Sequence, residues 1–272
     1  MTLRLVTLAV VLGWAGAASA EDFTIVVVPD TQTYAADPAL TPVLGRMVDH
    51  ILANKDAQNI DLVLHVGDLV DAGSQDLATA TTATQWQRFN SEWKRLDGQV
   101  AYAIVRGNHD NTAEFAQHYG EAHFGQLDGG GQPLFPHYLA THQGEGGDAS
   151  AWVANLGGND ALVLGISCSP TNAEIAWAQG LLDTHPDLPA IVLSHIVTAR
   201  FGLHPFSRTS HPACAGGPNL SIWNTLVAPN APQVFMTASG HFLSEHGYKA
   251  LRGVGEEVSC STPSRTSRSR RR

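Results

Sequence analysis

Residues 100–110 read VAYAIVRGNHD, an apolar run that ends in a glycine followed by three polar side chains. Four other apolar runs of the chain also end in polar residues. In chain order, the five clusters are Asp30-Thr31-Gln32, Gly67-Asp68, Gly107-Asn108-His109-Asp110, Ser194-His195 and Gly240-His241. A short apolar run bounded in this way predicts a buried strand, and α/β proteins form their sites beyond the carboxyl ends of strands. The sequence therefore predicts one site made from five strand ends.

The segments around these clusters alternate between strand-like and helix-like patterns. Strands are predicted from apolar runs at residues 23–28, 60–66, 100–105, 161–167, 190–193 and 233–237. Apolar residues three and four apart predict helices at residues 41–54, 86–96 and 173–182, and a short helix is expected at 222–226. The Gly-rich residues 125–150 are expected to form a loop. This alternation predicts an α/β fold in one domain, residues 21–255.

The composition excludes several classes of protein. Hydrophobic residues make up 43% of the 272 residues and charged residues 15%, which provides a large core and excludes disordered and fibrous chains. The formal net charge is −9, so a basic surface does not hold nucleic acid, and no nucleic-acid groove is expected. The 13 histidines outnumber the three cysteines and three methionines together, which favours metal or acid–base chemistry.

Both ends of the chain are predicted to lie outside the folded domain. Arg4 precedes an apolar run at residues 5–12, and Ala18-Ser19-Ala20 forms a cleavage pattern, as in a secretory signal peptide. The alternative, an N-terminal membrane anchor, needs a longer apolar run. We therefore expect a signal peptide at residues 1–20, a secreted or periplasmic protein, and no membrane association after cleavage. Residues 256–272, rich in Ser and Arg, predict a disordered tail, either a binder of anionic surfaces or a cloning or reading-frame artefact.

The chain has three cysteines, and an exported protein can use two of them for a disulfide. Cys168 and Cys214 are the expected pair, which leaves Cys260 over. The sequence has no CxxC spacing, so a zinc site with sulfur ligands is not expected.

The side chains in the five clusters are carboxylates, amides and imidazoles. Such oxygen and nitrogen ligands suit Mn, Fe or Zn. A glycine precedes Asp68, Asn108 and His241, which allows the backbone to turn sharply and brings the side chain close to an ion. Taken singly, an Asp at a strand end is usually a turn or a helix cap, and a His there is usually structural. The metal site is predicted from the five clusters together.

The order of these motifs resembles that of the calcineurin-like metallophosphoesterase superfamily. The shared pattern is Asp-x-Gln, Gly-Asp-x-x-Asp, Gly-Asn-His-Asp, His and Gly-His, and the opening VVVPDTQTY is similar to the branch with Asp-x-Gln in place of Asp-x-His. The resemblance covers about residues 23–246. It implies a two-sheet β-sandwich flanked by helices in four layers, a phosphate-ester substrate, and two divalent or trivalent metal ions, with Mn, Fe or Zn expected.

The resemblance also implies roles for individual residues. The implied metal ligands are Asp30 and Gln32 for the first ion, Asp68 as the bridge between both ions, and Asn108, His195 and His241 for the second ion. His109 is the expected acid or phosphate-binding group, and Asp71 is expected to orient it. Asn108, His109 and Arg106 are candidates for substrate binding, although Arg106 fits a surface ion pair equally well. His65 is interpreted as a core or second-shell histidine rather than a ligand.

The sequence departs from the family pattern after His241. The family commonly has Gly-His-x-His, but the second of these histidines is replaced here by Leu243. The first metal position is therefore expected to bind its ion weakly, or to use His246 or water. Two functions follow: a secreted metal-dependent phosphoesterase acting on monoesters or diesters by metal-activated water, or an exported metal- or phosphate-binding protein of feeble catalytic power.

Overall fold

The computed structural model of the protein describes residues 21–71, 81–142, 149–168, 170–197 and 222–241. The expected signal peptide, the expected tail, Cys214, Leu243 and His246 lie outside these residues, and the domain limits 21–255 stay a prediction. Within the described ranges, no helix has the length and apolar character needed to span a bilayer.

The first sheet is parallel and has the strand order β1-β2-β3. Its strands are β1 (Thr24–Val28), β2 (Ile60–His65) and β3 (Tyr102–Ile104). The central strand β2 is buried along almost its whole length, because helices cover one face and the second sheet covers the other. A strand buried on both faces needs a continuous apolar run, which explains why the sequence predicted this strand well.

The second sheet has the strand order β4-β5-β6-β7-β8. Its strands are β4 (Tyr138–Thr141), β5 (Ser150–Leu156), β6 (Asn159–Ile166), β7 (Ala190–Ser194) and β8 (Val234–Ala238). The pairs β4–β5 and β5–β6 are antiparallel, and β6–β7 and β7–β8 are parallel. Two expectations were wrong here: residues 125–150 contain β4 rather than only a loop, and β5 was not predicted. The edge strand β4 is half exposed and short, so it lacks the apolar run that marks a buried strand.

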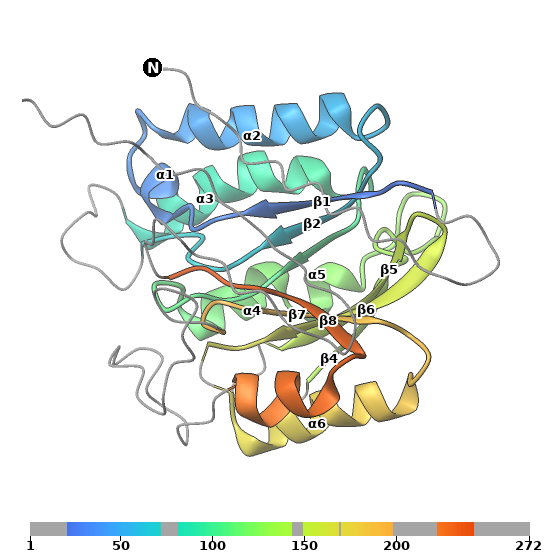
Figure 1. Cartoon of the computed structure of the whole chain (residues 1–272). Coiled ribbons are helices and arrows are strands. Elements are labelled where there is room, and N and C mark those ends of the chain that lie inside the picture. Colours follow the sequence, from blue (N-terminus) through green and yellow to red (C-terminus); the bar gives the residue numbers. More distant parts are fainter. Residues whose placement is uncertain (1–20, 72–80, 143–148, 169, 198–221, 242–272) are drawn as a thin grey trace, which may run out of the picture.

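Helices cover the outer faces of both sheets (Figure 1). The first sheet is covered by α1 (Gln32–Ala36), α2 (Thr41–Asn54) and α3 (Thr82–Trp93), and the second by α6 (Asn172–Thr184) and η4 (Trp223–Val227). The two sheets contact each other through β2 with β5 and β3 with β6. Two further helices, α4 (Thr112–Tyr119) and α5 (Glu121–Phe124), follow the first sheet, and the remaining short turns are η1 (Lys94–Leu96) and η5 (Ala228–Asn230). The expected α/β sandwich of two sheets flanked by helices is confirmed.

The carboxyl ends of the parallel strands of both sheets meet at one edge of the sandwich. The backbone N–H of Gly240, after β8, donates to the carbonyl of His195, after β7. The ring of His195 in turn contacts the carbonyl of Val66, after β2, at 2.8 Å. The carboxyl ends of five strands, three from the first sheet and two from the second, therefore lie at one common edge of the sandwich.

Cys168, which follows β6, is disulfide-bonded. Both other cysteines of the chain lie outside the described residues. The expected disulfide is therefore present, and its pairing with Cys214 stays a prediction.

Candidate metal centre

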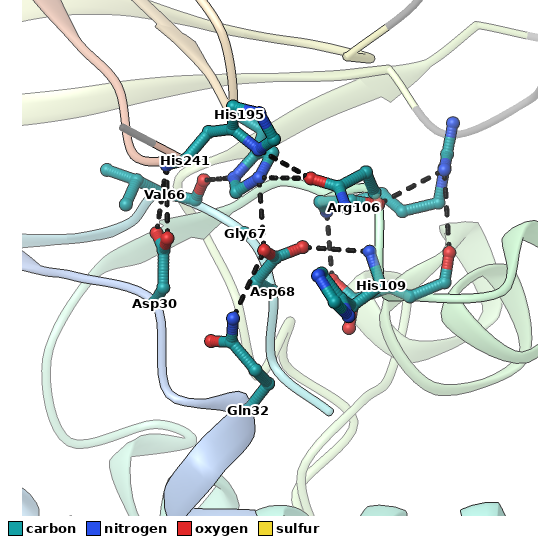
Figure 2. A network of polar contacts seen from close by, with 12 residues as sticks. Asp30, Gln32, Val66, Gly67, Asp68, Arg106, His109, His195 and His241 are labelled. Carbon is teal, nitrogen blue, oxygen red and sulfur yellow. Dashed lines mark hydrogen bonds and ion pairs between the residues drawn. The ribbon is translucent and has the colours of Figure 1, made fainter. Parts of the chain in front are cut away.

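Asp68 lies at the middle of the candidate site (Figure 2). It follows β2 through Gly67, and both residues have left-handed backbone angles, with φ of +97° at Gly67 and +53° at Asp68. This turn aims the buried Asp68 carboxylate across the edge of the sheet. Gly107, after β3, passes so close that a Cβ atom there would overlap the Asp68 carboxylate and backbone nitrogen. The two glycines predicted to allow sharp turns are therefore required by this geometry.

The Asp68 carboxylate contacts three of the other predicted site residues. Its Oδ1 atom accepts the backbone N–H of His109 at 2.9 Å. Its Oδ2 atom lies 3.2 Å from Nε2 of His195 and accepts the amide N–H of Gln32 at 3.4 Å. These partners follow β1, β3 and β7, so Asp68 lies between three of the strand ends, and its role as a bridge between two ions stays a prediction.

Acceptor atoms converge on one point beside Asp68. His195 contacts the Val66 carbonyl through Nδ1, so a neutral ring carries its proton there and a lone pair at Nε2. That Nε2 atom faces Oδ2 of Asp68 at 3.2 Å and Oδ1 of Asn108 at 3.0 Å, both of which are acceptors. His241 reaches the same Asn108 oxygen through Nδ1, at 2.7 Å. Acceptors can face one another in this way when a positive charge lies between them, either a second ring proton or a cation.

These side chains satisfy the requirements of a metal site. Single ligand atoms of Asp68, His195 and His241 all lie within 4.8 Å of one another. The amide nitrogen of Asn108 is buried and has no partner within the part of the chain that the structure describes, so the polar contacts of this side chain run through its oxygen. A set of carboxylate, amide oxygen and imidazole nitrogen ligands suits Mn, Fe or Zn. The four residues therefore fit a divalent cation.

The pKa values of Asp68 and His195 record how strongly these two groups interact. Burial acts to raise the pKa of Asp68, but the hydrogen bond and charge of His195 outweigh it, and the pKa is lowered. Burial acts to lower the pKa of His195, but Asp68 outweighs it, and the pKa is raised. Each of the two groups therefore shifts the pKa of the other towards its charged form. A cation that binds both groups competes with protons for them, so metal binding is expected to release protons.

Asp30 and Gln32 lie on the other side of Asp68 from His109 (Figure 2). The Asp30 carboxylate accepts the backbone N–H of His241 at 3.0 Å, and Gly240 leaves room for it, because a Cβ atom there would overlap an Asp30 oxygen. His241 has a left-handed φ of +66°, which completes this close approach. Burial, and to a lesser extent the charge of Asp68, raises the pKa of Asp30 in opposition to His195. Gln32 therefore contacts the Asp68 carboxylate and Asp30 contacts the His241 backbone, and their role as metal ligands stays a prediction.

His109 and Asp71 form a pair next to this centre. Oδ1 of Asp71 lies 2.7 Å from Nδ1 of His109, and the Asp71 side chain is fully buried whereas that of His109 is 23% exposed. The backbone N–H of Asp71 donates to the buried Gln85 side chain at 2.7 Å. A carboxylate in this position fixes the orientation of the ring. The structure therefore places Asp71 against the His109 ring, and the catalytic roles of both residues stay predictions.

Arg106 is placed differently from a residue that reaches into the centre. Its guanidinium donates to the carbonyl of Gly107 at 3.1 Å and to that of Asp110 at 3.4 Å, and the side chain is buried. These contacts stabilise the backbone of the segment that carries Asn108 and His109. The role of Arg106 in substrate binding stays a prediction.

Asp110 has a structural role that the sequence reasoning missed. Its buried carboxylate accepts the backbone N–H groups of Leu69 at 2.9 Å, Val70 at 3.0 Å and Gly107 at 2.9 Å. It therefore joins the segment after β2 to the segment after β3. Burial, followed by the charge of Asp68, raises the pKa of Asp110 to about 6. The available signal was its place at the end of Gly-Asn-His-Asp, the one motif residue that received no role.

Comparison with known proteins gives three findings. The sequence model of the family described as calcineurin-like phosphoesterase matches residues 23–223. The uncharacterized protein YvnB of Bacillus subtilis (strain 168) is 28% identical over 229 residues, and the match covers 82% of this chain and 15% of YvnB. The crystal structure of a dimetal phosphatase from Danio rerio is similar at 14% identity and a TM-score of 0.48, over 80% of this chain and 81% of that chain. The family match includes the site residues up to His195, and His241 lies beyond it.

Proposed function

This chain belongs to the calcineurin-like phosphoesterase family, and from that premise we propose that it is a metal-dependent hydrolase of phosphomonoesters or phosphodiesters with a binuclear metal centre. The observation that carries the proposal is the convergence of side-chain atoms that can bind a metal, from Asp68, Asn108, His195 and His241, on one point. A cation that binds a phosphate ester explains the arrangement.

The two metal positions use different ligands. The first position would be held by Asp30, Gln32 and Asp68, and the second by Asp68, Asn108, His195 and His241. Within the described ranges, the first position thus has one carboxylate and one neutral amide besides the shared Asp68, whereas the second has two imidazoles. We propose that the second position binds its ion more tightly, because imidazole is the stronger ligand for Mn, Fe or Zn.

The residues of the chain prepare the substrate and the proton transfer. Bound divalent ions would supply Lewis-acid activation of water and of the phosphoryl group. The backbone N–H of His109 holds Oδ1 of Asp68, so the bridging carboxylate is fixed before substrate arrives. Asp71 holds the His109 ring through Nδ1 and fixes its orientation. The His109 ring could then donate a proton to the departing alkoxide, or bind a phosphate oxygen.

We propose further that the protein acts outside the cytoplasm, in the periplasm or after secretion. This proposal is supported by the apolar run at residues 5–12 and the cleavage pattern Ala18-Ser19-Ala20. The measurement is the N-terminal sequence of the exported protein, which is expected to begin at Glu21.

Metal removal tests the proposed function. The purified chain, dialysed against a chelator, is expected to lose turnover of a chromogenic phosphodiester and a chromogenic monoester, and to regain it when Mn²⁺ or Zn²⁺ is added. Asn108→Ala is expected to lower the metal-restored rate, because the Asn108 oxygen contacts both imidazoles. If neither ester is hydrolysed with either metal, the protein is not this hydrolase. Tight binding of one ion per chain without turnover would instead favour the metal-binding protein.

His109→Ala is expected to lower kcat by about 10²–10³, the range of a lost general acid. Because the proton goes to the departing group, esters with poor leaving groups should lose more rate than nitrophenyl esters. Asp71→Asn should also lower kcat most for esters with poor leaving groups. The loss should be smaller than in His109→Ala, because the His109 ring is still present. The measurement is kcat for a series of esters with different leaving groups. An equal loss for all esters would assign His109 to phosphate binding and not to proton transfer.

A further inference from the structure

We propose that His65, the last residue of β2, is a positioning residue that fixes the segment carrying Asp30 and Gln32 against the segment carrying Asp68. The inference rests on the proposed function, since it concerns how those ligands are aligned for a metal ion. His65 is not one of the residues in the metal-ligand cluster of Asp68, His195 and His241.

The imidazole of His65 joins two backbone segments through its two nitrogens. Its Nδ1 atom accepts the backbone N–H of Gly67 at 3.2 Å. In the neutral ring the proton then lies on Nε2, which donates to the hydroxyl of Thr31 at 3.0 Å. Thr31 stands between the two predicted ligands of the first metal position, and Gly67 stands directly before the bridging Asp68. The His65 ring therefore hydrogen-bonds to residues that are direct sequence neighbours of three predicted ligands: Asp30, Gln32 and Asp68.

Two other hydrogen bonds run between the same segments. The backbone N–H of Thr31 donates to the carbonyl of Asp68 at 2.9 Å, and the Thr31 hydroxyl lies 3.5 Å from the carbonyl of Leu69. With the bonds of His65, these contacts form a continuous network between the end of β1 and the end of β2. Thr31 and His65 are both fully buried, so water does not replace a lost bond in this network.

The surroundings of His65 fix the orientation of its ring. The ring packs edge-on against Phe89, with ring centroids 5.5 Å apart, and against Trp93, with centroids 4.9 Å apart. Burial lowers the pKa of His65 to about 3, so the ring stays neutral and keeps one acceptor and one donor. A neutral ring held in this orientation can serve Gly67 and Thr31 at the same time. A purely apolar side chain would fill the space and serve neither.

The first metal position depends most on this arrangement. Its ligands come from both of the segments that His65 joins, Asp30 and Gln32 from one and Asp68 from the other. Loss of the ring bonds leaves the Gly67 N–H without its acceptor and the Thr31 hydroxyl with only its contact to the Leu69 carbonyl, so the segments are expected to shift. Removal of an outer partner of metal ligands typically weakens metal affinity by 10–100-fold.

The test is a calorimetric titration of metal-free protein with Mn²⁺, with His65→Phe, Thr31→Val and the double variant compared with the parent chain. His65→Phe keeps an aromatic ring against Phe89 and Trp93, and Thr31→Val keeps the shape of the side chain. In each single variant, we expect the more weakly bound of the two Mn²⁺ ions, the one at the first position, to bind at least about tenfold less tightly than in the parent chain. We expect the double variant to lose less than the sum of the two single losses, because both substitutions remove the bond between His65 and Thr31.

His123→Phe is the matched control. His123 is also buried among aromatic rings, its Nε2 contacts the Tyr102 hydroxyl at 2.7 Å, and burial lowers its pKa to about 3. It belongs to the helix α5 and to none of the five clusters that form the centre. Like His65→Phe, it is expected to lower the Tm, but its Mn²⁺ affinity should stay within twofold of the parent value.

The outcomes separate the inference from the proposed function. If the parent chain binds Mn²⁺ and His65→Phe and Thr31→Val bind it as tightly as the parent, the positioning role is refuted while the proposed function stands. Equal losses of affinity in His65→Phe and His123→Phe also refute it, because the effect is then one of general stability. If the parent chain binds neither Mn²⁺ nor, in a parallel titration, Zn²⁺, the proposed function itself is wrong, and the inference with it. Should His65→Phe not fold, the Thr31→Val titration decides.

Discussion

Asp68→Asn is expected to lower phosphoesterase turnover by about 10³-fold or more and to abolish tight binding of both metal ions. The amide removes the negative charge that both metal positions share, and it places an N–H group where His109 or His195 now contacts a carboxylate oxygen. Lewis-acid stabilisation is worth several kcal/mol, and each 1.4 kcal/mol corresponds to about tenfold in rate. The measurements are kcat/KM with saturating Mn²⁺ and the metal content of the protein after dialysis.

Asp97→Asn is the control for this substitution. Asp97 is a partly buried carboxylate that accepts the hydroxyl of Tyr102 at 2.8 Å, and it belongs to none of the five clusters. Its amide variant should keep the metal content and kcat/KM of the parent within about twofold. A parent-like metal content in Asp68→Asn would show that Asp68 does not bridge two ions.

Gly107→Ala is expected to destabilise the protein by about 3 kcal/mol or more and to remove metal binding. A Cβ atom at this position would overlap the Asp68 carboxylate and its backbone nitrogen, neither of which can move without breaking the turn after β2. Forced overlap in a close-packed region commonly costs about 1–3 kcal/mol and sometimes more. For a chain of this size the Tm should fall by roughly 10 °C. Thermal melting without metal measures this effect separately from metal loss.

Gly180→Ala provides the opposite case in the same chain. Gly180 lies in α6, and a Cβ atom there meets nothing within 4 Å. The alanine should stabilise the helix by about 0.5–1 kcal/mol and leave metal binding unchanged. If the two alanine variants melt alike, the close approach of Gly107 to Asp68 does not exist in solution.

The sequence predicted those strands and helices whose buried residues form a regular apolar pattern within the segment itself. Strand β2 and helix α2 were found because a doubly buried strand reads as a continuous apolar run and an amphipathic helix as a three- and four-residue period. Strand β4 was missed because it is short and half exposed. Strand β5 was missed although Gly157 and Gly158, which join it to β6, are a local signal of a hairpin. Helix α4 was missed too, since only Phe115 and Tyr119 of its eight residues are buried.

For the candidate site too, some residues could be predicted from local sequence and others could not. The residue types at the strand ends were sufficient to name Asp68, Asn108 and His195, because few structural reasons place carboxylate, amide and imidazole after successive buried strands. The residues that hold these ligands in place were harder to find. Asp110 acts through backbone N–H groups of segments about 40 residues away, and no local pattern in the sequence records such a contact.

The residues proposed as ligands at the common edge of the sandwich come from both sheets: Asp30, Asp68 and Asn108 follow strands of the three-stranded sheet, whereas His195 and His241 follow strands of the five-stranded sheet. An ion bound by all of them would hold the two sheets together. The free energy of metal binding would then oppose separation of the sheets, because separated sheets no longer present the ligands together. The metal ion would thus couple the packing of the two sheets to the assembly of the metal centre. A substitution that weakens the contact between the sheets should therefore also weaken metal binding.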